Sequence, residues 1–234
     1  MERSGQRLWW ILLLVAIFFL AGAVLRFFDP AQATQNPYSD LELYAGTPIP
    51  ATLRALLGVL SGVLGLLSVL AVEFGLSSDG RLRPLTGPVR LFATLAASAG
   101  FMLLTIHSFR ALALTPDLAH YYYALDDPAH HAPALMTLLI PVDPIQFFFS
   151  FGGALWALTV SIDLIKDKPR RWVTAIIGLV YAGAFFAMVL FVATDMGFGS
   201  LIVTIFGFGA VVPAWFIALA FHLRRLRSDA IRRS

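Results

Sequence analysis

Three basic side chains, His107, Arg110 and Arg54, are the residues best placed by type and spacing to bind a ligand. His107 and Arg110 are three residues apart, which places both on one face of a helix. All three lie in or at the ends of long apolar stretches, where an ionisable side chain is costly and is a candidate for function. Together they could attract an anionic group. Taken alone, His107 is more often a hydrogen-bonded core residue than a proton relay.

A second group of residues has the side-chain types that bind divalent cations. Its members fall in one polar segment of the chain: His120, Asp126, Asp127, His130 and His131. Their spacing matches no metal site with a known pattern, and acids beside adjacent histidines in a loop are usually solvated. We therefore predict no bound metal and keep these residues only as candidates.

The other charged residues of the apolar stretches lie near their ends. Glu73 and Arg90 could form an ion pair, and Asp163 lies beside Lys166. No charged residue is placed near the middle of an apolar stretch. This pattern argues against a proton pump, a channel with a charged filter and a voltage sensor.

Sequence signatures of enzymes and cofactors are missing. The chain has no HExxH, GxSxG or Walker-type motif, and it contains no cysteine for thiolate chemistry or iron–sulfur ligation. A membrane di-haem site needs four histidines, and only His107 and His222 fall in or beside apolar stretches, at opposite ends. We therefore expect no cofactor and assign no catalytic residue.

Composition places the whole chain in lipid. Of its 234 residues, 59% are hydrophobic and 13% are charged, and the mean hydropathy is +0.79. Soluble domains have about 45–50% apolar and about 25% charged residues. A water-soluble globule of this size could not bury so much apolar surface, and the same surplus excludes intrinsic disorder.

Continuous apolar runs predict an all-α bundle of six transmembrane helices in one domain. Each run approaches or exceeds the 20 or so residues needed to cross about 30 Å of hydrocarbon, and none alternates as barrel strands do. The predicted spans are residues 8–28, 51–75, 88–114, 144–165, 172–194 and 198–223. The first apolar run is longer than that of a signal peptide, which favours an uncleaved helix over a cleaved one.

Basic residues predict the orientation of these spans. All but three of the 17 Lys and Arg residues fall on the side that holds both chain ends, and the exceptions are Arg26, Arg54 and Arg110. The positive-inside rule makes that side the cytoplasm. The basic pI of about 9.5 is then a consequence of topology, and no nucleic-acid partner is needed.

Small residues predict where helices approach closely, because packing in lipid depends on close contact. Gly58 and Gly62 form a GxxxG pattern in the second span. This face could pack within the bundle or could join two copies of the chain in a homo-oligomer.

One stretch carries a family resemblance. Residues Phe151-Gly-Gly-Ala-Leu-Trp156, the following Pro169-Arg-Arg-Trp172 and then Ile177-Gly-Leu179 resemble a bacterial integral-membrane family known only as domain of unknown function 4386. The long outer loops and Pro141-Val-Asp-Pro144 depart from that family's pattern. The resemblance implies a six-helix fold in the bacterial inner membrane and assigns no catalytic residues.

These observations predict an integral, multi-pass protein of the cell membrane with cytoplasmic termini. The function favoured is a non-enzymatic scaffold or a subunit of a membrane assembly. The alternative is a small permease, or a protein that binds a lipid or anion in an outward-opening cavity near His107, Arg110 and Arg54. A membrane-embedded enzyme that acts on lipid through the outer histidines and carboxylates is a third interpretation.

Overall fold

The described part of the chain is helical. The computed structural model describes residues 9–27, 48–77, 87–124, 142–167, 172–193 and 206–233, and these ranges contain no strand. The helices are α1 (Trp9–Phe27), α3 (Pro48–Ser77), α4 (Pro88–Ala124), α6 (Val142–Asp167), α7 (Trp172–Ala193), the π-helical turn η4 (Gly207–Val211) and α9 (Val212–Arg233). The prediction of an all-α fold with six helices is confirmed for these residues.

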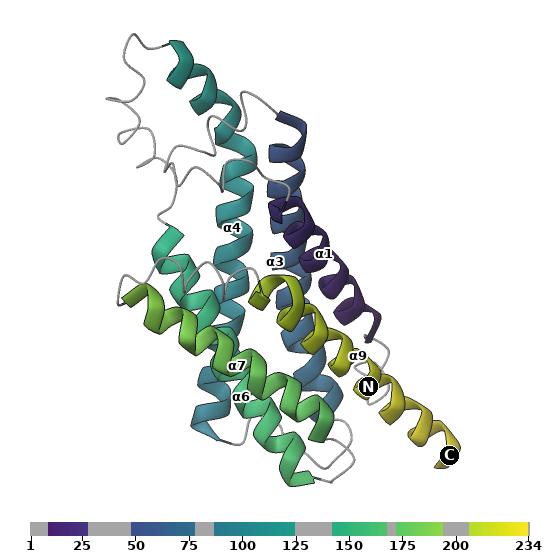
Figure 1. The fold of residues 1–234 in the computed structure, drawn as a ribbon. Coiled ribbons are helices and arrows are strands. Elements are labelled where there is room, and N and C mark those ends of the chain that lie inside the picture. Colours follow the sequence, from purple (N-terminus) through teal and green to yellow (C-terminus); the bar gives the residue numbers. More distant parts are fainter. Residues whose placement is uncertain are drawn as a thin grey trace.

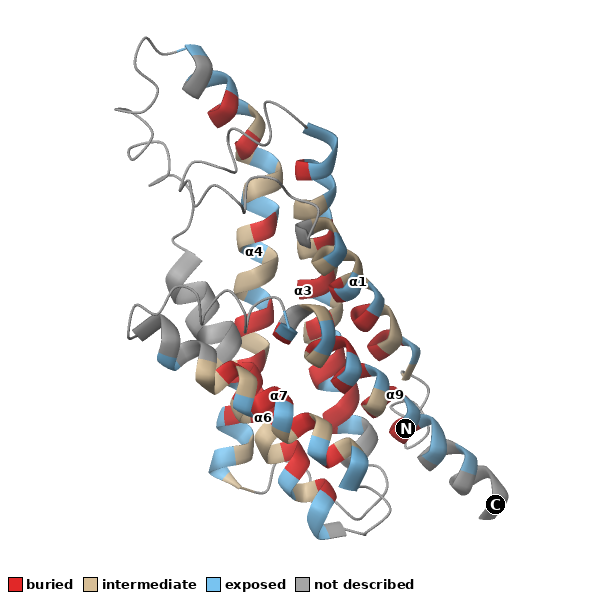
Figure 2. Cartoon of the chain, in the orientation of Figure 1, coloured by how far each residue is buried: buried red, intermediate tan, exposed pale blue. Residues whose placement is uncertain are grey.

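The helices pack in a ring (Figure 1). Along the chain, α1 contacts α3, α3 contacts α4, α4 contacts α6, α6 contacts α7 and α7 contacts α9. Helix α9 then contacts α1 and closes the ring. Figure 2 shows that buried residues concentrate where α6, α7 and α9 pack, whereas the far end of α4 is mostly exposed or half-buried.

Two of the helices are long and apolar enough to cross a membrane. They are the segments Pro48–Phe74 of α3 and Pro88–Tyr121 of α4, while Trp9–Leu25 and Trp172–Ala187 are shorter apolar segments. At about 1.5 Å per residue, the 37 residues of α4 extend about 55 Å. This helix is therefore longer than the hydrocarbon thickness of about 30 Å.

Helix α4 continues ten residues beyond its predicted end at residue 114, because Pro116 does not terminate it. Proline removes one backbone hydrogen bond and crowds the preceding turn. Just after it, Leu118 and Ala119 are only 6% and 3% exposed. Burial of these apolar side chains offsets the cost of the proline.

Proline has a different effect at the start of α9. The N–H of Val212 donates to the carbonyl of Gly207, five residues back, which makes η4 a π-helical turn. Pro213 follows, and its ring would crowd the carbonyl four residues earlier in a regular α-helix. The wider π turn relieves this crowding. Residues 198–205 of the predicted last span lie outside the described residues.

The glycines predicted to pack closely are in contact with α4 of the same chain. A methyl group on Gly58 would lie 2.9 Å from the Ser108 Cβ, and one on Gly62 would lie 2.9 Å from the Phe101 carbonyl oxygen. Both distances are too short for a real side chain. The GxxxG face therefore serves packing between α3 and α4, while the homo-oligomer itself stays a prediction.

Candidate functional site: an ionic cluster that joins three helices

A bidentate ion pair connects α3 to α4 near the short link between them. Glu73 lies one turn before the end of α3, and Arg90 lies in the first turn of α4. Arg90 Nε donates to Glu73 Oε2 at 3.2 Å, and Arg90 Nη2 donates to Glu73 Oε1 at 3.1 Å. The predicted Glu73–Arg90 pair is confirmed. Its planar, two-point geometry is the strong form of a charge-assisted hydrogen bond.

Helix α6 joins this pair through two side chains. Trp156 Nε1 donates to Glu73 Oε1 at 3.1 Å, and Arg90 Nη1 donates to Asp163 Oδ2. Trp156 and Asp163 are seven residues apart, so two helical turns place them on one face of α6. The sequence places Asp163 beside Lys166 but does not predict its contact with Arg90.

Thr94 completes the set. Its hydroxyl lies 3.3 Å from Glu73 Oε1 and 2.9 Å from the Arg90 carbonyl oxygen, four residues back. The one hydroxyl proton can serve either acceptor. Glu73, Arg90, Thr94, Trp156 and Asp163 are called the Glu73 cluster below.

The Glu73 cluster is buried at one end and open to solvent at the other. The exposed fractions of the side chains are 7% for Glu73, 12% for Arg90 and 32% for Asp163. Two carboxylates share one guanidinium, so the formal charges of the cluster sum to one negative charge. Removing one member of such a buried pair leaves the other charge buried without a partner. The resulting loss of stability is much larger than the net stabilisation that the intact pair provides.

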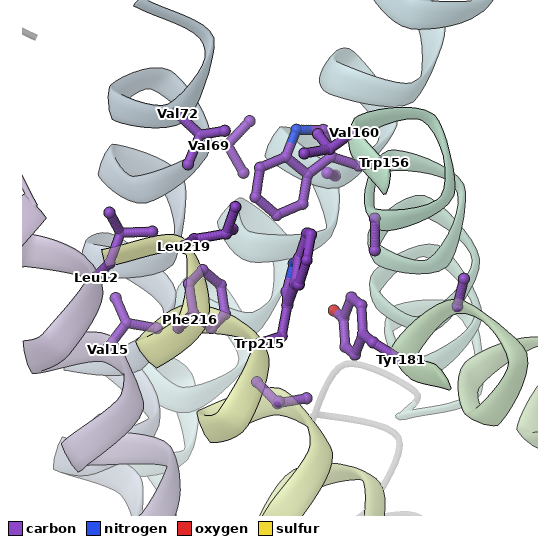
Figure 3. Close-up of a cluster of buried hydrophobic side chains, with 14 of the residues drawn as sticks. Leu12, Val15, Val69, Val72, Trp156, Val160, Tyr181, Trp215, Phe216 and Leu219 are labelled. Carbon is purple, nitrogen blue, oxygen red and sulfur yellow. The ribbon is translucent and has the colours of Figure 1, made fainter. Parts of the chain in front are cut away.

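Aromatic side chains pack around Trp156, the indole donor of the cluster (Figure 3). Trp156 of α6 meets Trp215 of α9 edge to face, with ring centroids 6.5 Å apart and planes at 74°. Phe216 lies 6.4 Å from Trp156, measured between ring centroids. Trp156, Trp215 and Phe216 are all fully buried. The indole N–H of Trp215, unlike that of Trp156, has no acceptor among the described residues.

Two consecutive glycines allow α6 to reach its neighbours. A methyl group on Gly152 would lie 2.5 Å from both the carbonyl carbon and oxygen of Ala96 in α4, and one on Gly153 would lie 2.6 Å from Tyr181 Oη in α7. The stretch Phe151–Trp156 thus supplies the close approach to α4 and the indole donor to Glu73. This is the stretch that carries the family resemblance.

The predicted ligand residues lie elsewhere. His107 and Arg54 are half-buried and Arg110 is exposed, and His107 is seventeen residues beyond Arg90 along α4, or about 25 Å. Gly58 of α3 contacts Ser108 of α4. Along the axis of α4, this contact places Arg54 within about two helical turns of His107 and Arg110. Whether the three form one binding site stays a prediction.

Only one of the five metal candidates lies among the described residues. His120 is exposed near the end of α4, and Asp126, Asp127, His130 and His131 lie outside the described residues. Within the described ranges, no three histidine, aspartate or glutamate side chains gather closely enough to hold a metal ion. His222, considered as a haem ligand, lies in α9 and is 9% exposed.

Comparison with known proteins returns no relative: no family model, no curated protein and no solved structure matches this chain. The resemblance to the family of unknown function is therefore still a prediction.

A matched pair of substitutions tests the cluster's indole bond. Trp156→Phe and Trp215→Phe remove equivalent ring volume from the same core, but only Trp156 donates to a carboxylate. A hydrogen bond to a charged group contributes about 1.5–3 kcal/mol. We expect Trp156→Phe to lower the free energy of unfolding by about 2 kcal/mol more than Trp215→Phe does, measured by denaturant titration in detergent micelles. Equal losses would show that the bond to Glu73 contributes nothing.

Proposed function

We propose that this chain is a multi-pass protein of the bacterial inner membrane with six spans and both termini in the cytoplasm. The helices that form the ring support this topology, as do the two that are long and apolar enough to span. The Glu73 cluster and the Arg224–Trp9 contact lie where α1, α3, α4, α6 and α9 adjoin the basic segments. One basic end of the bundle is what the positive-inside rule requires.

We infer that its role is non-enzymatic, as a scaffold or a subunit of a membrane assembly. The observation that carries this inference is the use of Glu73. Its carboxylate is 7% exposed and accepts hydrogen bonds from two neighbouring helices, α4 and α6. A group that moves protons or binds substrate needs access, whereas this one holds three helices in register.

The outer surface of α4 is suited to a partner in the membrane. Leu91, Leu95, Met102, Ile106 and Phe109 follow one another at helical spacing, and each is at least 40% exposed. Helix α4 contacts α3 and α6, and this stripe is left outside those contacts. A transmembrane helix of another subunit could pack along it.

Native purification followed by native mass spectrometry tests the proposed function. We expect a second protein at fixed stoichiometry, or a second copy of the chain, to remain bound through the membrane. A single chain without any bound protein would contradict the proposal. If that single chain instead retained one anionic lipid, and Arg54→Gln with Arg110→Gln released it, the alternative of a lipid- or anion-binding protein would replace it.

A further inference from the structure

The last helix continues beyond the ring. Helix α9 was expected to span the membrane only to residue 223, yet it runs without interruption to Arg233. Its final turns project past the N-terminal end of α1 (Figure 1). These turns therefore have no other described helix to pack against over most of their length.

The projecting turns are strongly basic. Residues 224–233 contain five arginines and a single acid, Asp229. Leu219 and Leu223 are fully buried in the ring, and Leu226 and Ala230 continue the same helical stripe in the sequence. A cluster of basic residues that directly follows a spanning helix is typical of segments that bind anionic lipid headgroups.

Helix α1 contributes an aromatic platform at the point where α9 leaves the ring. The Arg224 guanidinium carbon lies 5.2 Å from the centroid of the Trp9 ring. Arg224 and Arg225 are exposed, and the neighbouring Trp10 is 49% exposed. Tryptophan is enriched at the headgroup level of bilayers, and the planar guanidinium of arginine matches the two oxygens of a phosphate.

We propose that Trp9, Arg224, Arg225 and the remaining turns of α9 to Arg233 form a binding site for anionic phospholipid headgroups on the cytoplasmic face. The platform fixes one guanidinium at headgroup depth, and the basic turns continue from it along the axis of α9. The inference rests on the proposed function for its topology. Zwitterionic lipid offers no net charge and should bind there much less.

A single-cysteine reporter tests the site. The chain contains no cysteine, so Ser228→Cys, at an exposed position in the projecting turns, can carry an environment-sensitive dye without background labelling. The full-length protein is reconstituted in nanodiscs of phosphatidylcholine with or without phosphatidylglycerol. We expect the dye emission to shift to the blue only with phosphatidylglycerol, and the shift to diminish in high salt.

Two variants make the test specific. Arg224→Gln/Arg225→Gln/Arg227→Gln should weaken the response to phosphatidylglycerol at least tenfold, since each arginine near an anionic surface contributes about a fivefold change. Arg225→Gln/Arg227→Gln retains the Trp9 contact and should weaken it by an intermediate factor. The control Lys166→Gln/Lys168→Gln/Arg170→Gln removes the same charge from another basic segment and should respond as the unmodified chain does.

The same reporter separates the inference from the topology it rests on. Equal emission in both nanodiscs, an equal loss in the control, or a blue shift with short RNA in place of phosphatidylglycerol would overturn the headgroup site. Reaction of the Ser228→Cys thiol with a membrane-impermeant maleimide from outside intact cells would contradict the topology alone, because lipid preference in nanodiscs does not depend on it.

Discussion

Gly152→Ala is expected to lower the free energy of unfolding by about 2–3 kcal/mol, as overpacking of a close helix contact does. The added methyl group would lie 2.5 Å from the Ala96 carbonyl carbon and oxygen. These are backbone atoms, which cannot rotate away as a flexible side chain can. Helix α6 must move off α4, and this movement also pulls Trp156 and Asp163 away from Glu73 and Arg90.

Gly183→Ala is the matched control, because a methyl group on Gly183 would have nothing within 4 Å. Alanine is favoured over glycine in a helix by up to about 1 kcal/mol. The control should therefore leave stability unchanged or raise it, so the two substitutions should have opposite signs. Thermal unfolding in detergent, followed by tryptophan fluorescence, measures both. If Gly152→Ala were as stable as Gly183→Ala, the close contact between α4 and α6 would be wrong.

Glu73→Leu is expected to have the largest effect of any single change to the cluster, a loss of about 3–5 kcal/mol. It leaves the Arg90 guanidinium, 12% exposed, with only Asp163 as a charged partner among the cluster residues. It also deprives the buried indole N–H of Trp156 of its acceptor. Denaturant titration of the purified protein measures the loss.

A second substitution should partly restore stability. Glu73→Leu/Arg90→Leu removes both charges of the buried pair together. The remaining carboxylate, Asp163, is exposed enough to be solvated. The double variant should therefore be more stable than Glu73→Leu alone, as replacement of a whole buried ion pair often is. Asp163→Asn, in a partly exposed position, should cost only about 1 kcal/mol. Additive losses in the double variant would contradict the coupling of Glu73 and Arg90.

The positions of the helices can be predicted from the long apolar runs, because a continuous apolar run of this length has few stable arrangements other than a helix. The Glu73–Arg90 pair could also be predicted, because a short link between antiparallel helices brings their adjoining ends together. The end of α4 could not be predicted from Pro116, since burial of Leu118 and Ala119 outweighs the rule that proline ends a helix.

The rest of the Glu73 cluster depends on how distant segments meet. Trp156 and Asp163 reach Glu73 and Arg90 only because α6 lies against α4, and nothing local to residues 156–163 encodes that neighbour. The spacing of seven between Trp156 and Asp163 is a signal that could have paired them on one face. Only the family resemblance singles out Gly152, because the sequence does not reveal which backbone lies opposite a glycine.

Accessibility of two engineered thiols, introduced one at a time, tests the central claim most directly. Asp117→Cys lies at the exposed far end of α4, and Ser228→Cys lies at the opposite, basic end of the bundle. Six spans with cytoplasmic termini predict that a membrane-impermeant maleimide labels the Asp117→Cys variant on intact cells. The same reagent should label the Ser228→Cys variant only after the membrane is permeabilised. Labelling of Ser228→Cys on intact cells, or recovery of the protein in the soluble fraction without detergent, would contradict the account.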